Sequence, residues 1–182
     1  MLTGKNLVLR PLKADDVEKI NGWRNNLELI RLAQGIRFPK TLEMDKHWLD
    51  TVCNDMSNKN IFWGIVKKDT NELIGIAQLN AIDYISGTAN WGISIGETSL
   101  HGKGHGVEAL KLMLDYAFFV LNLRKVTSYN LINNKATLRF QEKVGGAIQE
   151  GVLKSHVFFY GEYHDVVILS LFRENYVPYE NK

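Results

Sequence analysis

Two periods of hydrophobic and polar residues alternate along this chain and divide it into candidate strands and helices. Residues 6–12 (NLVLRPL) alternate aliphatic and polar side chains, which predicts a first strand. Residues 14–31 change to helical spacing, with Asp15 and Asp16 where the first turn begins. The apolar face of this predicted helix contains Val17, Ile20, Trp23 and Leu27. We therefore expect a strand followed by one long helix.

The next part of the chain predicts a short helix and then an antiparallel meander. Residues 42–54 form the helix, for which Thr41 is a suitable N-cap. The side chains that should face inward from it are Trp48, Leu49 and Val52. Three strand-like segments follow at 61–67, 73–84 and 89–95. Turn-forming residues at 69–71 and 86–87 separate them, so neighbouring strands should run in opposite directions.

Helical spacing returns directly after a cluster of glycines and predicts a long amphipathic helix over residues 107–121. The remaining segments are a strand at 125–131, a helix at 136–144, and a closing strand pair at 147–159 and 166–172 around a turn at 160–162. No repeat or linker interrupts this order. We therefore expect one mixed α/β domain spanning residues 1–182.

Charge and composition narrow the possible partners. The chain has 22 basic and 20 acidic residues and no run of five like charges, so neither nucleic acid nor a membrane is favoured as a partner. Its first residues lack the pattern of a secretory signal, which favours a cytoplasmic location. The single cysteine, Cys53, cannot form an intramolecular disulfide. No Cys/His cluster has metal-ligand spacing, so we expect no metal site.

The glycine cluster is the strongest candidate for chemistry. In the run from His101 to Gly106, three glycines join the end of a predicted strand to the start of a predicted helix. Glycine allows positive φ, so several backbone N–H groups can point at one anion at the positive end of the helix. This arrangement predicts a diphosphate site. The alternative is that the glycines only close a tight connection between strand and helix.

Two better-known phosphate loops do not match this run. A P-loop needs Gly-Lys followed by Ser or Thr, whereas Gly104 follows Lys103 here. A dinucleotide-binding motif needs GxGxxG and an acidic residue about twenty positions further on, where this chain has Asn122. Nucleoside triphosphates and dinucleotides are therefore not the predicted ligands.

Short motifs spread over most of the chain carry a resemblance to a known family. They are Leu9-Arg10-Pro11-Leu12, Gly102-Lys103-Gly104-His105-Gly106, Asn134-Lys135-Ala136-Thr137, Glu142-Lys143-Val144-Gly145 and Gly161-Glu162-Tyr163-His164-Asp165. With them the chain resembles the GNAT superfamily of N-acetyltransferases, in particular the branch of ribosomal-protein alanine and amino-sugar nucleotide acetyltransferases. The resemblance implies an α/β (α+β) fold in which about four helices flank a single mixed, mostly antiparallel sheet.

The resemblance also implies acetyl-CoA as cosubstrate and a set of residues that bind it. The diphosphate would lie on the backbone amides of residues 102–106, with His101 opening this signature and Lys103 and His105 adding positive charge. The pantetheine arm would run beside the strand that ends at Ser94 and Ile95 and extend the sheet. Asn134 matches the family asparagine that steadies this arm, and Thr137 belongs to the same motif.

Two departures from the family pattern affect catalysis. In members that acetylate protein N-termini, a glutamate shortly before the asparagine is the general base and a tyrosine shortly after it is the general acid. Tyr129 and Gln141 stand at these positions here. The family's usual acid–base pair therefore cannot be carried over to this chain.

Three other residues are candidates for the catalytic role. An amine attacks a thioester only when neutral, so a group near it has to take a proton. Glu97 follows the strand expected beside the thioester and is the first candidate. His164, next to Asp165, is the second, and Tyr129 is the third because it lies on the strand next to the pantetheine. Each of them has a structural alternative: Glu97 as a solvated loop residue, His164 as a packed strand residue, and Tyr129 as a group that only orients the acceptor.

The triplet Trp23-Arg24-Asn25 points to the acceptor. It is similar to a triplet of amino-sugar nucleotide acetyltransferases, in which aromatic and cationic groups meet a base and a phosphate. We therefore expect transfer to a small-molecule amine, with an amino-sugar nucleotide first and a ribosomal-protein N-terminus as the alternative. A non-catalytic acyl-CoA-binding regulatory domain is a further alternative, because the usual acid–base pair is missing. A homodimer is compatible with the sequence.

Overall fold

The computed structural model describes residues 1–33, 38–134, 143–159 and 161–179. These residues form an eight-stranded sheet in the order β1-β2-β3-β4-β5-β6-β8-β7. The strands are β1 (Leu2–Thr3), β2 (Leu7–Pro11), β3 (Ile61–Lys67), β4 (Leu73–Asp83), β5 (Thr88–Ile95), β6 (Lys125–Leu131), β7 (Ala147–Phe159) and β8 (Glu162–Phe172). The α-helices are α1 (Val17–Arg24), α2 (Leu27–Ala33), α3 (Leu42–Cys53) and α4 (His105–Asp115). The expected mixed, mostly antiparallel sheet with about four helices is confirmed.

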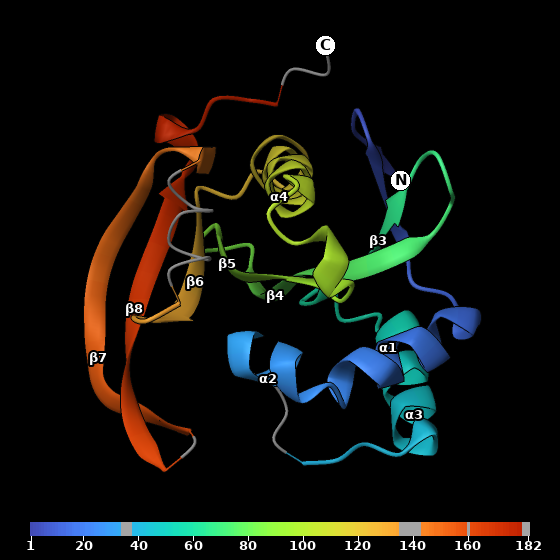
Figure 1. The fold of residues 1–182 in the computed structure, drawn as a ribbon. Helices are drawn as coiled ribbons and strands as arrows, with labels where there is room; N and C mark the ends of the chain where they lie inside the picture. The colour runs from blue at the N-terminus through green and yellow to red at the C-terminus, as the bar shows by residue number, and fades with distance from the viewer. Residues whose placement is uncertain (34–37, 135–142, 160, 180–182) are drawn as a thin grey trace.

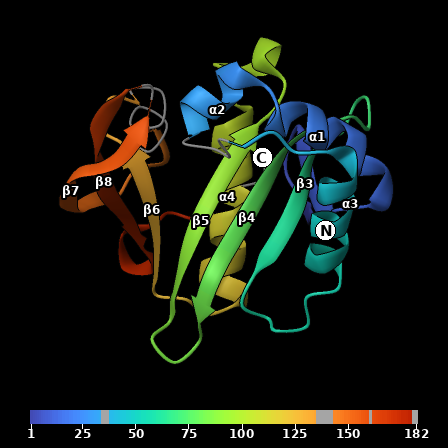
Figure 2. The same cartoon turned by 90° about the horizontal axis from the view of Figure 1, so that it is seen from below.

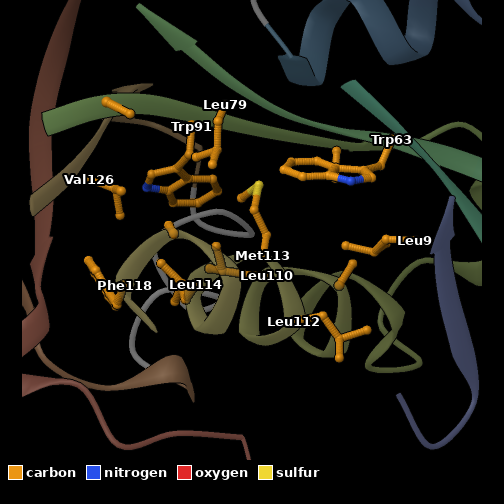
Figure 3. Packing of buried hydrophobic residues seen from close by; sticks show 14 of the residues in the cluster. Leu9, Trp63, Leu79, Trp91, Leu110, Leu112, Met113, Leu114, Phe118 and Val126 are labelled. Carbon is orange, nitrogen blue, oxygen red and sulfur yellow. The ribbon is translucent and has the colours of Figure 1, made fainter. Parts of the chain in front are cut away.

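The helices cover the two faces of the sheet in different ways, as Figure 1 shows. Helix α4 lies on one face, whereas α1, α2 and α3 lie on the other. The larger core is on the α4 side, where Leu110, Met113 and Phe118 pack against Trp63 and Trp91 of the strands (Figure 3). A smaller core lies under α1 and α3. It contains Leu12, Val17, Ile20, Leu49, Val66 and Leu73.

The centre of the sheet opens between β5 and β6. These two strands are parallel and pair only where they begin, with Thr88 opposite Lys125 and Asn90 opposite Thr127. β5 continues to Ile95 and β6 to Leu131 without further pairing among the described residues. In Figure 2 the two strands separate along their length. All other neighbouring strands pair antiparallel, so this opening divides β1–β5 from β6–β8.

The prediction of a single helix over residues 14–31 is wrong. A short 3₁₀ turn at Ala14–Asp16 comes first, and α1 and α2 then follow with a break at Asn25 and Asn26. The Asn26 side chain accepts hydrogen bonds from the N–H groups of Glu28 and Leu29, so it caps a new helix. Because the helix restarts, Leu27 leaves the apolar face and is 68% exposed. Val17, Ile20 and Trp23 lie on the inner face as predicted.

Other boundaries differ less. The predicted helix at 107–121 is α4 followed by a π-helical turn at Tyr116–Val120, in which the Leu121 N–H bonds the Tyr116 carbonyl. Strand β8 begins at Glu162 instead of residue 166, because Tyr163 and His164 pair with Phe158 and Val157 of β7. The predicted helix at 136–144 lies outside the described residues except for 143 and 144, which are helical.

Two structural findings concern membranes and metals. None of the helices in the described ranges is both long and apolar enough to cross a bilayer. Within the same ranges, no group of three or more His, Cys, Asp and Glu side chains is arranged to hold a metal ion.

Candidate active site

The unpaired edge of β5 presents backbone groups to the opening in the sheet. The Gly96 N–H bonds the Ile74 carbonyl of β4, and residues of an antiparallel strand alternate between its two edges. The register of β4 and β5 is regular from Ile95 back to Asn90. Ser94 therefore directs its backbone groups toward β4, whereas Ile93 and Ile95 direct theirs into the opening. A chain that carries amide groups can extend the sheet at these two residues.

The glycine turn lies between this strand and α4. Gly104 is the N-cap of α4 with φ +90°, and Gly102 has φ +77°, so both adopt the left-handed conformation that favours glycine. The N–H groups of residues 104–107 have no partners within the helix, and Gly104 has no side chain to cap them. Apart from the adjoining residues of the chain, no atom lies within 4 Å of where a Cβ would stand at either glycine. Lys103 is exposed beside them. An anion therefore has both donors and space here.

The His101 side chain ties the glycine turn to the end of β5. Its Nε2 lies 2.8 Å from the carbonyl oxygen of Ile95, one of the groups that faces the opening. His101 thus contacts the edge predicted to bind the pantetheine arm, and does so through its imidazole. His105, in the first turn of α4, is half-buried.

A pocket of about 410 Å³ lies on the other face of the sheet, between the strands and α1–α3. Its lining residues are Ile20, Trp23, Arg24, Leu29, Ile30, Trp48, Phe62, Ile76, Gln78, Gly92, Ile93 and Ser94. Three consecutive residues of β5, from Gly92 to Ser94, therefore form one wall of the pocket. The same strand borders the opening and leads to the glycine turn. The pocket and the candidate coenzyme site thus share β5.

Trp23 connects the pocket to the end of β5. A Cβ at Gly96 would overlap the Trp23 ring, so the absence of a side chain at Gly96 lets the indole lie against the backbone. The indole Nε1 donates to Glu97 Oε1 at 3.4 Å. The Lys19 ammonium lies 3.3 Å from the same oxygen and also pairs with Glu72. Glu97 therefore contacts Trp23, a residue that lines the pocket, but does not line the pocket itself.

Arg24 lines the pocket and is already paired. Its Nη1 lies 2.9 Å from Oδ1 of Asp45, a buried carboxylate that also accepts a hydrogen bond from Asn21. The Arg24 guanidinium stacks over the Trp48 ring, with its Cζ 4.4 Å from the ring centroid. Burial lowers the pKa of Arg24, although the charge of Asp45 opposes this effect. The group remains a cation, but it has little uncompensated charge.

Asn25, the third residue of the triplet, has a structural role. Its side chain accepts a hydrogen bond from the Lys40 N–H and donates to the carbonyls of Lys40 and Asn21. These contacts fasten the end of α1 to the segment before α3, and Asn25 is not among the residues that line the pocket. The structure therefore brings Trp23 and Arg24 together in the pocket and leaves Asn25 outside it.

The other candidates lie on or beyond β6. Tyr129 is about half-exposed on this strand, on the same face as its neighbours Thr127 and Leu131. The His164 imidazole contacts the Phe159 carbonyl at 3.1 Å, within the β7–β8 hairpin and away from the residues that line the pocket. Asn134 follows β6 in a turn in which its N–H bonds the Leu131 carbonyl. Thr137 and Gln141 lie outside the described residues.

Two parts of the site were not predicted from the sequence. The first is Ile93, whose backbone groups face the opening. Every second residue of β5 faces this edge, but the sequence does not say which ones do, because that depends on the hydrogen bonds to β4. The second is the set of apolar residues from α2, α3, β3 and β4 that complete the pocket. These residues are Leu29, Ile30, Trp48, Phe62 and Ile76, with Gln78. Nothing in the sequence separates them from ordinary core residues.

A mixed sheet that opens beside a glycine-rich helix start, with a pocket across the open strand, defines a class of transferases that use coenzyme A. The chain belongs to the Acetyltransferase (GNAT) domain family, whose model matches residues 6–147. It is therefore an acetyl-CoA-dependent N-acetyltransferase.

Individual relatives cover nearly the whole chain. The SPbeta prophage-derived uncharacterized N-acetyltransferase YokL of Bacillus subtilis is 25% identical and spans 96% of this chain and 94% of its own length. The spermidine N(1)-acetyltransferase of Escherichia coli K12 is 27% identical, over 97% of this chain and 91% of its own. A crystal structure of spermidine N-acetyltransferase from Vibrio cholerae with CoA and spermine superposes with a TM-score of 0.84 at 24% identity, over 94% of this chain and 98% of that one. This likeness establishes the fold.

Proposed function

We propose that acetyl-CoA and the amine approach β5 from different directions. The diphosphate lies on the amides of the glycine turn, and the pantetheine arm follows Ile93 and Ile95 along the unpaired edge. The acceptor amine enters the pocket under α1–α3. The observation that carries this proposal is the position of residues 92–94, which line the pocket on the same strand whose edge faces the opening. The thioester and the amine then meet at β5. We also propose that the chain works as one domain, since a single sheet runs through it.

The reaction is a direct transfer. The nitrogen of the neutral amine attacks the carbonyl carbon of the thioester, the C–N bond forms, and the C–S bond breaks with its electron pair going to sulfur. The amine loses one proton and the coenzyme A thiolate gains one, so the products are the amide and free coenzyme A. Positioning of the two reactants supplies much of the rate, and a group that accepts the proton supplies the rest.

We propose Glu97 as the proton acceptor, through a water molecule. Its carboxylate lies at the end of β5 and touches Trp23, which lines the pocket. Lys19 and the Trp23 indole hold this carboxylate in place. Tyr129 remains a candidate for orienting the acceptor, because its side chain is exposed on the strand across the opening. His164 remains a weaker candidate, since its imidazole is engaged with the hairpin backbone.

Three classes of acceptor come from different lines of reasoning. An amino-sugar nucleotide is suggested by the motif that contains Trp23 and Arg24, and both of these residues line the pocket. A polyamine is supported by the relatives named for spermidine. A protein N-terminus is the third option. All three share a primary amine, which is the part of the acceptor that the proposed site requires.

Release of free thiol from acetyl-CoA tests this function. The assay uses the purified chain with acetyl-CoA and a panel of primary amines. Release that depends on the amine, with an equal amount of acetylated amine by mass spectrometry, is the expected result. Tight binding of acetyl-CoA without turnover on any amine would instead indicate a regulatory acyl-CoA-binding domain.

A further inference from the structure

We infer that the acceptor is an amine with one positive charge and an apolar, aromatic-sized body, and that the pocket discriminates against polycations and nucleotides. This inference rests on the proposed function, because it concerns the acceptor side of the same site. It follows from the composition of the pocket wall, the charges within it, and the contacts that its two tryptophans already make.

The pocket wall is apolar. Eight of its twelve residues carry aliphatic or aromatic side chains, contributed by α1, α2, α3 and the strands. Only three carry polar side chains, namely Arg24, Gln78 and Ser94. Burying an apolar body against such a wall is favourable by about 25 cal/mol per Å² of apolar surface removed from water. A volume of about 410 Å³ is at the small end of the range for ligand pockets, which suits a compact molecule.

The described lining of the pocket offers no counter-charge for a second ammonium group. Among the described residues that line it there is no carboxylate, and Arg24 is the single ionisable one. The nearest buried carboxylate, Asp45, already pairs with Arg24 and accepts a hydrogen bond from Asn21. A polyamine that placed a further ammonium in this pocket would lose hydration there and meet Arg24.

Both tryptophan rings of the pocket already have a cation of the protein beside them. The Arg24 guanidinium lies over the Trp48 ring, 4.4 Å from its centroid. The Lys19 ammonium lies 5.9 Å from the centroid of the Trp23 ring. Aromatic faces are the usual alternative to carboxylates for holding an ammonium group. Because both rings already contact a cation of the protein, they are less available to bind an ammonium group of the acceptor. They remain suited to packing against an apolar body.

The same contacts disfavour a nucleotide diphosphate. Phosphate recognition needs donors whose charge is available, and guanidinium groups do it by presenting two N–H groups to the anion. Arg24 is the one cation of the described lining, and Asp45 compensates its charge. The amino-sugar nucleotide that the triplet suggests therefore has an aromatic surface to contact, but no uncompensated cation among the described residues that line the pocket.

A comparison of acceptors tests the inference on the unmodified protein. The value of kcat/KM is measured at saturating acetyl-CoA for 2-phenylethylamine, spermidine and a uridine-diphosphate 4-amino-sugar. We expect 2-phenylethylamine to exceed the other two by about tenfold or more, corresponding to about 1.4 kcal/mol in transition-state binding. Equal or faster acetylation of spermidine or of the nucleotide would overturn the inference while leaving the proposed function intact. Thiol release that no amine stimulates would instead refute the proposed function.

A charge placed in the pocket provides a second test. Ile30 is a half-buried lining residue of α2, whereas Leu27 lies on the same helix, is 68% exposed and is outside the lining. Ile30→Glu should raise the ratio of kcat/KM for spermidine to that for 2-phenylethylamine by about tenfold. Leu27→Glu adds the same charge to the same helix and should change this ratio by less than about twofold. An equal change in both variants would show that the general surface charge, not the pocket, sets the preference.

Discussion

Gly104 is the residue on which the candidate coenzyme site most depends. It holds φ +90° at the start of α4, and its N–H belongs to the group of donors without partners in the helix. A larger residue would be strained at this φ and would project into the space where we place the diphosphate. We expect Gly104→Val to raise the Kd for CoA by about a hundredfold or more, which corresponds to about 2.7 kcal/mol, as measured by isothermal titration calorimetry.

The matched control for this substitution is Gly161→Val. Gly161 has φ +85° in the β7–β8 turn, and no atom lies within 4 Å of where its Cβ would stand. The backbone strain of the two variants is therefore similar, but only one of them is in the proposed site. Gly161→Val should bind CoA like the unmodified protein. An equal loss of affinity in both variants would mean that strain, and not the site, explains the effect.

Glu97 is the proposed proton acceptor, so its substitution should slow the reaction. Glu97→Gln keeps the shape of the side chain but cannot accept a proton, so we expect kcat to fall by about a hundredfold in the thiol-release assay. Lys19 pairs with both Glu97 and Glu72, and Glu72→Gln therefore removes the other partner of the same ammonium. Glu72→Gln should keep the kcat of the unmodified protein. The same loss in both variants would show that Glu97 acts only by holding Lys19.

At the scale of elements, the link between β2 and α1 depends on one buried ion pair. Arg10 donates two hydrogen bonds to Asp16, at 2.7 and 2.8 Å, and the Lys13 N–H donates a third. Burial by itself would raise the pKa of the Asp16 carboxyl, but these donors outweigh it and lower the pKa below its ordinary value. Since the charged form is favoured in the folded state, the pair stabilises the protein above that ordinary pKa, and its contribution is lost as pH falls through the lowered pKa.

We therefore expect Asp16→Asn to lower the free energy of unfolding by about 2–3 kcal/mol near pH 7. The difference from the unmodified protein should shrink as the pH falls below about 4, because the Asp16 carboxyl then takes up a proton in the unfolded state, and at lower pH in the folded state too. Urea unfolding at several pH values measures both effects. Asp15→Asn, at the exposed neighbouring position, is the control and should have little effect. A difference that stays constant down to low pH would contradict the role of the ionised carboxylate.

The elements also show what the sequence could predict. The antiparallel meander, α3 with its Thr41 cap and the strand β7 agree with the predicted boundaries, because their patterns are long and have clear turn residues on either side. The break at Asn25 and Asn26 was missed, because two asparagines within a helical period are compatible with a continuous helix until the Asn26 cap is seen. The π-helical turn after α4 was missed too, because the spacing of its apolar residues does not differ visibly from that of an α-helix.

The coenzyme side of the candidate site could be predicted better from the sequence than the acceptor side. The glycine turn is local, so its residues could be named from the chain. The pocket combines residues from six elements, and its lining residues become neighbours only through the fold. Trp23 and Arg24 were found through a short motif, but Asn25 of the same motif serves to fasten α1 to the Lys40 segment.

At the scale of the whole molecule, the sheet separates the two halves of the proposed reaction. Helix α4 lies on one face and α1–α3 on the other (Figure 1). The larger core is on the α4 face, and the proposed acceptor pocket is on the face of α1–α3. Because β5 and β6 pair only over their first residues, the sheet is open where the two substrates have to meet. Our proposal that the donor lies on one side of β5 and the acceptor on the other rests on the position of this opening more than on any single side chain.

The most direct test of this arrangement is a titration of the ¹⁵N-labelled protein with CoA, followed by amide chemical shifts. We expect the largest shifts at residues 102–107 and at Ile93 and Ile95, with small shifts in the β7–β8 hairpin. Saturable binding of CoA that leaves the amides of the glycine turn and of Ile93 and Ile95 unchanged, and shifts another part of the sheet, would show that CoA does not bind at the glycine turn.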